Sequence, residues 1–315
     1  MQLIQMASYV FNSSHRANGS TMDIFGDLKK RHGFEPGAGF VETGLPGVRF
    51  FWSTEPVARA PLIYNAGLVL MLQGNKTGYL GDRVFHYDPD HYLVLSVPLP
   101  FECETHATAD EPMLGLFVDI ERADLIEFLK LMKLDGPVPR TATSLGVTPA
   151  ALHGEMRDAV HRLMRALCSD AASQALGAGI LREILFHAIE GPHGPSLRAL
   201  AQEGTHHGRV SQSIVTIREN YAAPLSVDAM AREVGMSVPV FHRAFKAVTG
   251  TSPLQYLKAT RLARAKGLIL SEGLPANEAA RRVGYDNPSH FSREFKKHFG
   301  VSPKDARTGY IPIDI

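Results

Sequence analysis

The residues of this chain best suited to chemistry are basic side chains at helical spacing. They occur in two sets, and a phenylalanine precedes each set. Phe241 precedes Arg243 and Lys246, and the same order returns in Arg293 and Lys296. If the segment is helical, Phe241 faces the interior while the two basic side chains point outward. Guanidinium and ammonium groups on a surface bind anions, and phosphate oxygens above all. The pattern indicates a surface for a polyanion.

These residues belong to an internal repeat. VDAMAREVGMSVPVFHRAFKAVTGTSP begins at Val227, and ANEAARRVGYDNPSHFSREFKKHFGVSP begins at Ala276. The copies match at an offset of 49 residues before a turn and 50 after it, and a turn tolerates an insertion best. The matching pairs are Ala231/Ala280, Val234/Val283, Gly235/Gly284, Phe241/Phe291, Arg243/Arg293, Phe245/Phe295, Lys246/Lys296, Gly250/Gly300, Ser252/Ser302 and Pro253/Pro303.

Each copy has the layout of a helix, a tight turn and a second helix. Gly235 and Gly284 end the first helices, where a residue with positive φ is favoured. Ser237 and the Asn287–Pro288 pair have the residue types that begin the next ones. We therefore expect helix-turn-helix units over 227–250 and 276–300, each with an outward basic face and an N-terminus suited to phosphate.

A long helix that begins at Ser252–Pro253 is expected to join the two units. About eighteen residues at 1.5 Å each span roughly 27 Å. Successive major grooves on one side of duplex DNA lie ~34 Å apart. One rigid helix could therefore hold two recognition helices near the spacing of two grooves.

From about Ser211 to Tyr310 the sequence closely resembles the AraC/XylS family of bacterial transcription regulators. The segments IVTIRENYAAPLSVDAMAREVGMS and GYDNPSHFSREFKKHFGVSPKDAR carry the resemblance. Ala276, Ala279 and Ala306 depart from the family pattern, because larger aliphatic or aromatic residues are usual there. The resemblance implies double-stranded operator DNA as a partner, and RNA polymerase if the chain is an activator. The predicted DNA-binding residues are Ser237, Pro239, His242, Arg243, Lys246, Asn287, Ser289, Ser292, Arg293 and Lys296.

Ahead of this region the sequence changes character. A chain of 315 residues with 44% hydrophobic residues is expected to form two packed units. Short β-like runs separated by turn residues fill 34–120 and predict an antiparallel sandwich or small barrel. The resemblance extends, less specifically, to a cupin-like N-terminal β-barrel. The fold class is therefore α+β: this barrel with a helical segment, then an all-α domain of two helix-turn-helix units.

Composition shifts suggest domain boundaries. The predicted parts are a tail (1–20), a cupin-like effector-sensing domain (21–120), a helical dimerisation segment (121–190), an interdomain linker (191–210) and a DNA-binding domain (211–311). His206 and His207 are expected to be polar linker residues. An amphipathic stripe over Pro149–Leu167 has two interpretations: the seam of a homodimer, or a face packed on the barrel. Dimerisation is the preferred one.

Two hypotheses compete for the N-terminal domain: a module that senses a small organic effector, or a metal-dependent enzyme. Enzymatic cupins need clustered histidines with a glutamate, converging on one metal. His86, His91 and His106 do not make that pattern. We therefore expect no catalytic residue, no metal and no cofactor.

Three residues are candidates to bind an effector: Trp52, Tyr64 and Cys103. Cys103 could be a sensor thiol, although a small buried hydrophobe is its more common role. Aromatic residues in strands are likewise more often plain core than pocket lining.

Charge supports the division of the chain. Residues 207–315 hold 16 Lys and Arg against 9 Asp and Glu, whereas the remainder is acidic. The basic part suits a polyanion partner. With only two cysteines and no apolar run long enough to span a bilayer, we expect a cytoplasmic, nucleoid-associated protein without a membrane partner.

Overall fold

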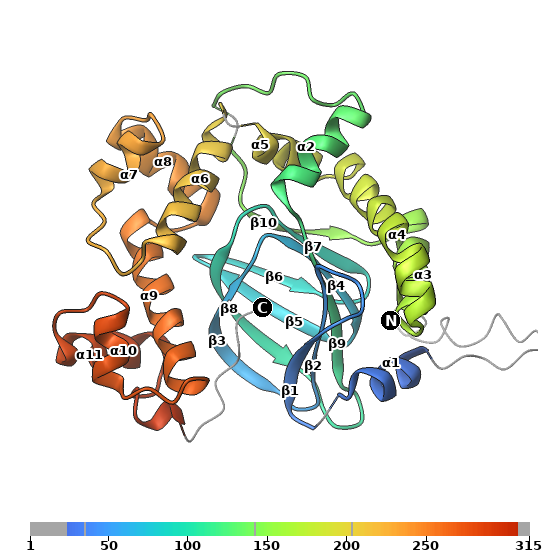
Figure 1. Cartoon of the computed structure of the whole chain (residues 1–315), viewed down its shortest axis with the longest axis horizontal. Helices are drawn as coiled ribbons and strands as arrows, with labels where there is room; N and C mark the ends of the chain where they lie inside the picture. Colours follow the sequence, from blue (N-terminus) through green and yellow to red (C-terminus); the bar gives the residue numbers. More distant parts are fainter. Residues whose placement is uncertain (1–23, 35, 142, 203, 308–315) are drawn as a thin grey trace, which may run out of the picture.

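The structure is a computed structural model that describes residues 24–34, 36–141, 143–202 and 204–307. A short helix is followed by antiparallel strands, and further helices flank the strands on both sides (Figure 1). The predicted 1–20 tail lies outside the described residues. Within the described ranges, no helix is both long and apolar enough to cross a membrane.

Two antiparallel sheets form the β domain. One has the order β1-β2-β9-β4-β7-β10 and the other β3-β8-β5-β6. The strands are β1 Ala38–Glu42, β2 Val48–Ser53, β3 Val57–Tyr64, β4 Gly67–Gln73, β5 Asn75–Leu80, β6 Arg83–Tyr87, β7 His91–Leu95, β8 Leu99–His106, β9 Met113–Asp119 and β10 Val147–Ala151.

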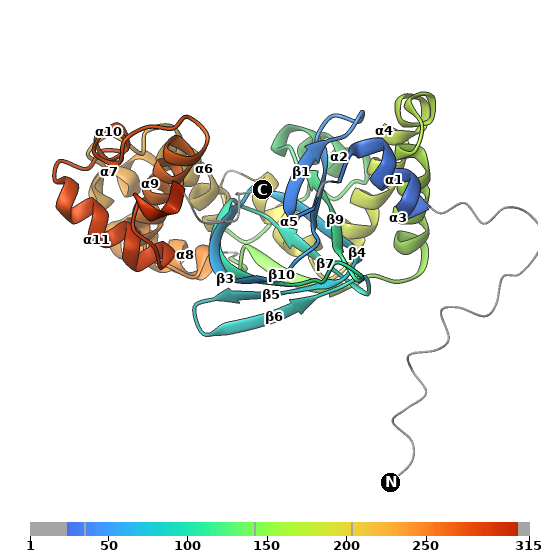
Figure 2. The ribbon, with the colours of Figure 1, turned by 90° about the horizontal axis from the view of Figure 1, so that it is seen from below.

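Residue patterning explains how these strands are covered. In β8 the side chains of Phe101, Cys103 and Thr105 are buried while their neighbours are partly exposed, so one face of the strand points into the domain. In β4 and β9 every residue but the last is buried. Continuous burial means that both faces of a strand are covered. In Figure 2 helices lie on one side of the β domain and the C-terminal helices on the other.

Helices make up most of the remaining chain, which confirms the predicted α+β class. They are α1 Ile24–His32, α2 Arg122–Leu131, α3 Gly154–Leu167, α4 Asp170–Glu190, α5 Gly194–Ala201, α6 His206–Glu219, α7 Val227–Glu233, α8 Val238–Thr249, α9 Pro253–Leu270, α10 Ala276–Arg282 and α11 Pro288–Phe299, followed by a short 3-10 helix at Asp305–Arg307.

The helix predicted to begin at Pro149 begins five residues later. Residues 147–151 form β10, an edge strand in which Pro149 pairs with Leu93. An edge strand can accept proline because one side of it needs no ladder hydrogen bonds. Gly154, at φ +56°, then lets the chain turn into α3.

The amphipathic stripe on α3 packs inside the chain. Met156, Val160, Leu163 and Leu167 are buried in the large apolar cluster that contains the β-domain core. Of the two interpretations of the stripe, packing against the domain is the one that the structure supports. A homodimer, if formed, needs a different surface.

The segment 191–210, predicted as a linker, is largely helical. Pro195 stands in the first turn of α5, and the Thr205 side chain caps α6 by accepting a hydrogen bond from Gly208 N at 2.9 Å. His207 is fully buried, so the prediction that it is a polar linker residue is wrong. Gly and Pro are frequent both in loops and at the start of a helix, so their presence at the beginning of this segment does not distinguish a linker from α5.

Burial makes His207 a source of acid sensitivity. Among the described residues neither ring nitrogen has a hydrogen-bond partner, and desolvation lowers the pKa of the His207 ring from 6.5 to about 4. The folded state therefore holds the ring neutral while the unfolded state protonates it below pH 6.5. Stability is lost as the pH falls from 6.5 towards 4, by roughly 3 kcal/mol in total from this residue.

His207→Gln should flatten this loss, whatever its effect on stability at neutral pH. Urea unfolding between pH 4 and 7 measures the slope. His206→Gln, which changes the less buried neighbour, is the matched control and should keep the wild-type slope. Identical slopes in the wild type and His207→Gln would show that this ring does not set the acid response.

Candidate functional site

The first unit is built from α7, a turn and α8. Gly235, at φ +63°, makes the turn, and Arg209 of α6 donates hydrogen bonds to the carbonyl oxygens of Val234 and Gly235 at 3.1 and 2.6 Å. Phe241 and Phe245 are fully buried with ring centroids 5.5 Å apart. These contacts orient α8, whose opposite face is exposed.

The second unit repeats this arrangement with α10 and α11. Gly284 adopts φ +82°, and Phe291 and Phe295 are fully buried with ring centroids 5.6 Å apart. Asn287 caps α11, since its side chain accepts hydrogen bonds from Ser289 N and His290 N at 2.9 and 3.0 Å. Ser237 occupies the same position in the first unit without a side-chain cap bond. The hydrogen bonds from the backbone of α11 therefore fix the Asn287 side chain at the start of the helix.

The predicted DNA-binding residues lie on α8 and α11 or cap them, and these are the recognition helices of the two units that α9 joins (Figure 1). All ten are exposed except Ser292, which is partly exposed. In α8 they are Ser237, Pro239, His242, Arg243 and Lys246, and in α11 they are Asn287, Ser289, Ser292, Arg293 and Lys296.

Sequence reasoning missed two further polar residues on α11. His290 and Lys297 are exposed on α11, and Lys297 adds a positive charge to the surface that the repeat indicated. Lys258 of α9 forms an ion pair with Glu294 of α11, which ties the second recognition helix to the connecting helix. A helical projection of 288–299 would have revealed these two residues, but the contact between α9 and α11 can be found only from the tertiary structure.

Two of the three residues suggested for an effector, Tyr64 and Cys103, are brought together, and Trp52 is not. Tyr64 and Cys103 lie in the interior of the β domain, with Cys103 Sγ 3.7 Å from Tyr64 Oη. Trp52 lies elsewhere, stacked on Phe34 with ring centroids 4.8 Å apart. Successive side chains of a strand point to opposite faces, and which face is internal depends on how the sheets pack.

Sequence reasoning missed the two residues that complete this interior cluster. Lys76 is almost fully buried and donates a hydrogen bond from Nζ to Tyr64 Oη at 2.9 Å. Tyr87 Oη lies 3.2 Å from Tyr64 Oη and 3.6 Å from Cys103 Sγ. Desolvation lowers the pKa of Lys76 and raises that of Cys103, which favours an uncharged amine beside a thiol. No property of Lys76 in the sequence separates it from a surface lysine.

The histidines of the β domain do not converge. His86 and His106 each lie 3.0 Å from Thr77 Oγ1, whereas His91 bonds Asp88 at 2.8 Å. Among the described residues, no group of three or more His, Cys, Asp or Glu side chains is placed to hold a metal ion.

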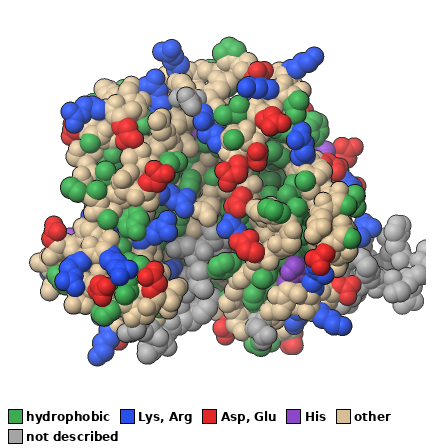
Figure 3. Space-filling view, viewed as in Figure 1, with side chains coloured by type: hydrophobic (Ala, Val, Ile, Leu, Met, Phe, Trp, Pro, Cys, Tyr) green, Lys and Arg blue, Asp and Glu red, His purple; other side chains and the backbone are tan. Residues whose placement is uncertain are grey.

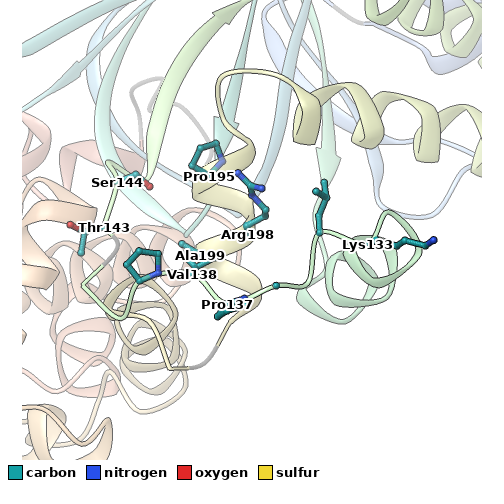
Figure 4. A pocket seen from close by; sticks show the side chains of 11 residues that line it. Lys133, Pro137, Val138, Thr143, Ser144, Pro195, Arg198 and Ala199 are labelled. Carbon is teal, nitrogen blue, oxygen red and sulfur yellow. The ribbon is translucent and has the colours of Figure 1, made fainter.

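Cavities at the surface lie between elements rather than over the recognition helices. One, of about 510 Å³, lies between the loop after α2 and helix α5 (Figure 4). Its walls include Pro137, Val138 and Pro195, with Arg198 as a charged side chain from α5. A second cavity, between β3, α6 and α9, contains more charged groups and is described below.

Comparison with known proteins identifies the family. Residues 44–196 match the family described as AraC-type transcriptional regulator N-terminus, and residues 230–309 match a helix-turn-helix domain family. The chain belongs to the AraC family of transcriptional regulators.

Relatives in this family agree with that assignment. The HTH-type transcriptional activator RhaS of Klebsiella pneumoniae (strain 342) is 30% identical over 147 residues, which is 46% of this chain and 51% of the relative. RhaS of Salmonella schwarzengrund (strain CVM19633) is 31% identical over 114 residues, 36% of this chain and 41% of the relative. The chain thus spans about half or less of the length of these curated relatives.

A solved structure supports the fold over most of the chain. ToxT from Vibrio cholerae strain SCE256, crystallised with an unsaturated fatty acid, has a TM-score of 0.57 and 11% identity, and the match covers 89% of this chain and 99% of ToxT. At this identity the likeness concerns the fold alone. A β domain followed by helices is therefore an architecture shared with a known protein.

Gly284 is expected to be essential to the turn that presents α11. An added Cβ would lie 2.3 Å from the Ala222 carbonyl oxygen, and the backbone is left-handed. Gly284→Ala should lower the free energy of unfolding by about 2–4 kcal/mol, from conformational strain and overlap together. Gly300→Ala isolates the strain, because Gly300 has φ +79° with nothing within 4 Å. Gly300→Ala should lower the free energy of unfolding, measured by chemical denaturation, by only about 1 kcal/mol. Equal losses would show that the contact with Ala222 contributes nothing.

Proposed function

We propose that the protein is a sequence-specific regulator of transcription that reads two major grooves of one DNA duplex. The observation that carries the proposal is the exposed basic face on each of two recognition helices, α8, which precedes α9 in the chain, and α11, which packs along α9. A helix of 18 residues is about 27 Å long, near the ~34 Å between successive grooves. Arg243 and Arg293, at matching positions of the repeat, are proposed to contact bases.

Other exposed residues are proposed to position the protein on the backbone of the DNA. Lys246 and Lys296 stand one turn further along each recognition helix, where a point charge suits a phosphate. The first turn of α11, capped by Asn287, places the positive end of the helix dipole at the same exposed surface. Figure 3 shows Lys and Arg side chains over the C-terminal helices, with acidic side chains among them.

The N-terminal domain is proposed to sense an organic effector without transforming it. Support comes from the separation of His91 from His86 and His106, which leaves no histidine triad of the kind a metal-dependent cupin enzyme uses. A regulator that acts on chromosomal DNA is placed in the bacterial cytoplasm, and RNA polymerase is a further partner if the protein activates transcription. Recovery of an effector chemically changed by the purified protein would favour the enzyme instead.

Arg243→Ala tests direct readout. On a duplex selected from a random pool by the wild-type protein, loss of a bidentate contact to guanine should weaken binding by about 1–3 kcal/mol and relax the preference at one base position. Lys246→Ala should weaken binding to selected and random duplexes alike, and should reduce the dependence on salt by about one ion. Fluorescence anisotropy at several salt concentrations measures both effects.

Arg281→Ala is the matched control, since Arg281 is exposed on α10 outside the predicted binding set. It should leave sequence preference unchanged. Equal weakening of selected and random DNA by Arg243→Ala would mean that Arg243 contacts only phosphate. No binding of the wild-type protein to any duplex in the pool would overturn the proposed function itself.

Helix α4 is the proposed surface for a homodimer. Leu176 and Phe186 on this helix are 58% and 40% exposed, although the helix is apolar around most of its circumference. An apolar helix that is only partly covered is typical of a protein interface. A dimer would raise the effective concentration of the second DNA-binding domain at a two-part operator.

Leu176→Lys with Phe186→Lys should raise the dimer dissociation constant at least about ten-fold, because each lysine places a charge in a buried apolar contact. Sedimentation equilibrium measures the change. Leu131→Lys is the control, since Leu131 is 62% exposed but lies at the end of α2. A wild-type protein that is monomeric at micromolar concentration, or a double variant that pairs as the wild type does, contradicts this interface.

A further inference from the structure

A cleft of about 490 Å³ lies where the β domain meets the DNA-binding region. Ile63 and Asn65 contribute from the end of β3 and the turn after it, while Arg218 comes from α6. The far wall is one face of α9, which includes Thr260 and Arg264. A molecule in this cleft would contact both parts of the chain at once.

Two arginines without carboxylate partners face this cleft. Arg218 donates a hydrogen bond from Nη2 to Asn65 Oδ1 at 2.8 Å, and Arg264 lies over the Tyr221 ring, 5.7 Å from its centroid. Among the described residues neither guanidinium forms an ion pair. Glu272 is the acidic residue in the cleft wall, and its Oε2 lies 3.6 Å from Arg282 Nη1 instead.

The charges that line the cleft favour a bound anion. Burial lowers the pKa of Arg218, and the positive charge of Arg264 lowers it further. Two like charges beside one cavity, one of them half-buried, are stabilised by an anion that accepts hydrogen bonds from both. Carboxylates match the planar guanidinium group in geometry.

The remaining walls define the rest of the ligand. Tyr221, Tyr256 and Leu268 supply ring and aliphatic surface next to the arginines. Inorganic phosphate would leave that apolar surface in contact with water, whereas an organic acid would cover it.

We infer that this cleft binds a small organic carboxylate with an apolar body, held by Arg218 and Arg264. The inference rests on the proposed function for its consequence, which is control of DNA binding. A carboxylate that pairs with Arg218 competes with Asn65, the residue through which α6 is hydrogen-bonded to the β domain. Occupancy therefore changes how the DNA-binding region is held against the β domain, and by linkage changes DNA affinity.

The test uses the full-length protein and 3-phenylpropionate as the probe, with 3-phenylpropanamide and inorganic phosphate as matched comparisons. Isothermal titration calorimetry without DNA should detect the carboxylate at millimolar concentration or below, and should detect the amide and phosphate at least about ten-fold more weakly. Equal binding of the amide, or tighter binding of phosphate, would overturn the assignment of an organic carboxylate.

Variants locate the site. Arg264→Gln changes an exposed residue, so its fold should be retained, and it should weaken the carboxylate about ten-fold. Arg218→Gln should do the same, and circular dichroism reports whether it folds. Arg281→Gln, on exposed α10, is the control and should bind as the wild type does. Unchanged binding in Arg264→Gln would place the carboxylate elsewhere and overturn the inference.

Asn65→Ala tests the competition. It removes the internal partner of Arg218, so the carboxylate should bind at least as tightly as in the wild type. Weaker binding would contradict competition at Arg218. The titrations contain no DNA, so they stand if the protein proves not to bind DNA. Conversely, a protein that binds its selected duplex but no carboxylate refutes this inference and leaves the proposed function intact.

Discussion

The contact between the first helix-turn-helix unit and the β domain is the interaction on which the rest of the structure depends. Phe245 and Val248 of α8 belong to the same apolar cluster as the β-domain core, whereas the second unit has a separate core. Tyr256 of α9 is buried and donates its hydroxyl to the Pro98 carbonyl oxygen at 2.8 Å. Gly146 N donates to the Val248 carbonyl oxygen at 2.7 Å. One DNA-reading unit is thus part of the larger core, and the other is attached through α9.

This difference gives the two units different mechanical roles. The first cannot shift on the β domain without exposing apolar surface, at roughly 25 cal/mol for each Å². The second can follow α9, to which Lys258 and Glu294 tie α11. A ligand that changes how α6 and α9 pack against β3 would change the spacing of the two recognition helices, because α9 connects them. A contact of a few residues could in this way influence how two grooves are read.

Buried polar groups mark where the fold gives up stability. Lys76 inside the β domain and His207 at the start of α6 are both held without a carboxylate partner among the described residues, and both have a lowered pKa because of desolvation. A position that served only to fill the core would carry an aliphatic residue, because burying an unpaired polar group costs free energy. Neither residue belongs to a recognition helix: Lys76 lies in β5 and His207 in the first turn of α6.

Local rules let the sequence by itself determine the tandem units: Gly235 and Gly284 at positive φ, the Asn287 cap, the paired phenylalanines and the outward arginines all act within a few residues. Short β-like runs likewise predicted an antiparallel N-terminal part. Tertiary structure alone decided that residues 149–151 pair as a strand, that His207 is buried, and that Trp52 and Tyr64 lie apart. It also brought Asn65 and Arg218 together across 153 positions. Which face of a strand or helix is covered depends on distant surfaces, and their arrangement is a property of the packed chain rather than of any local pattern.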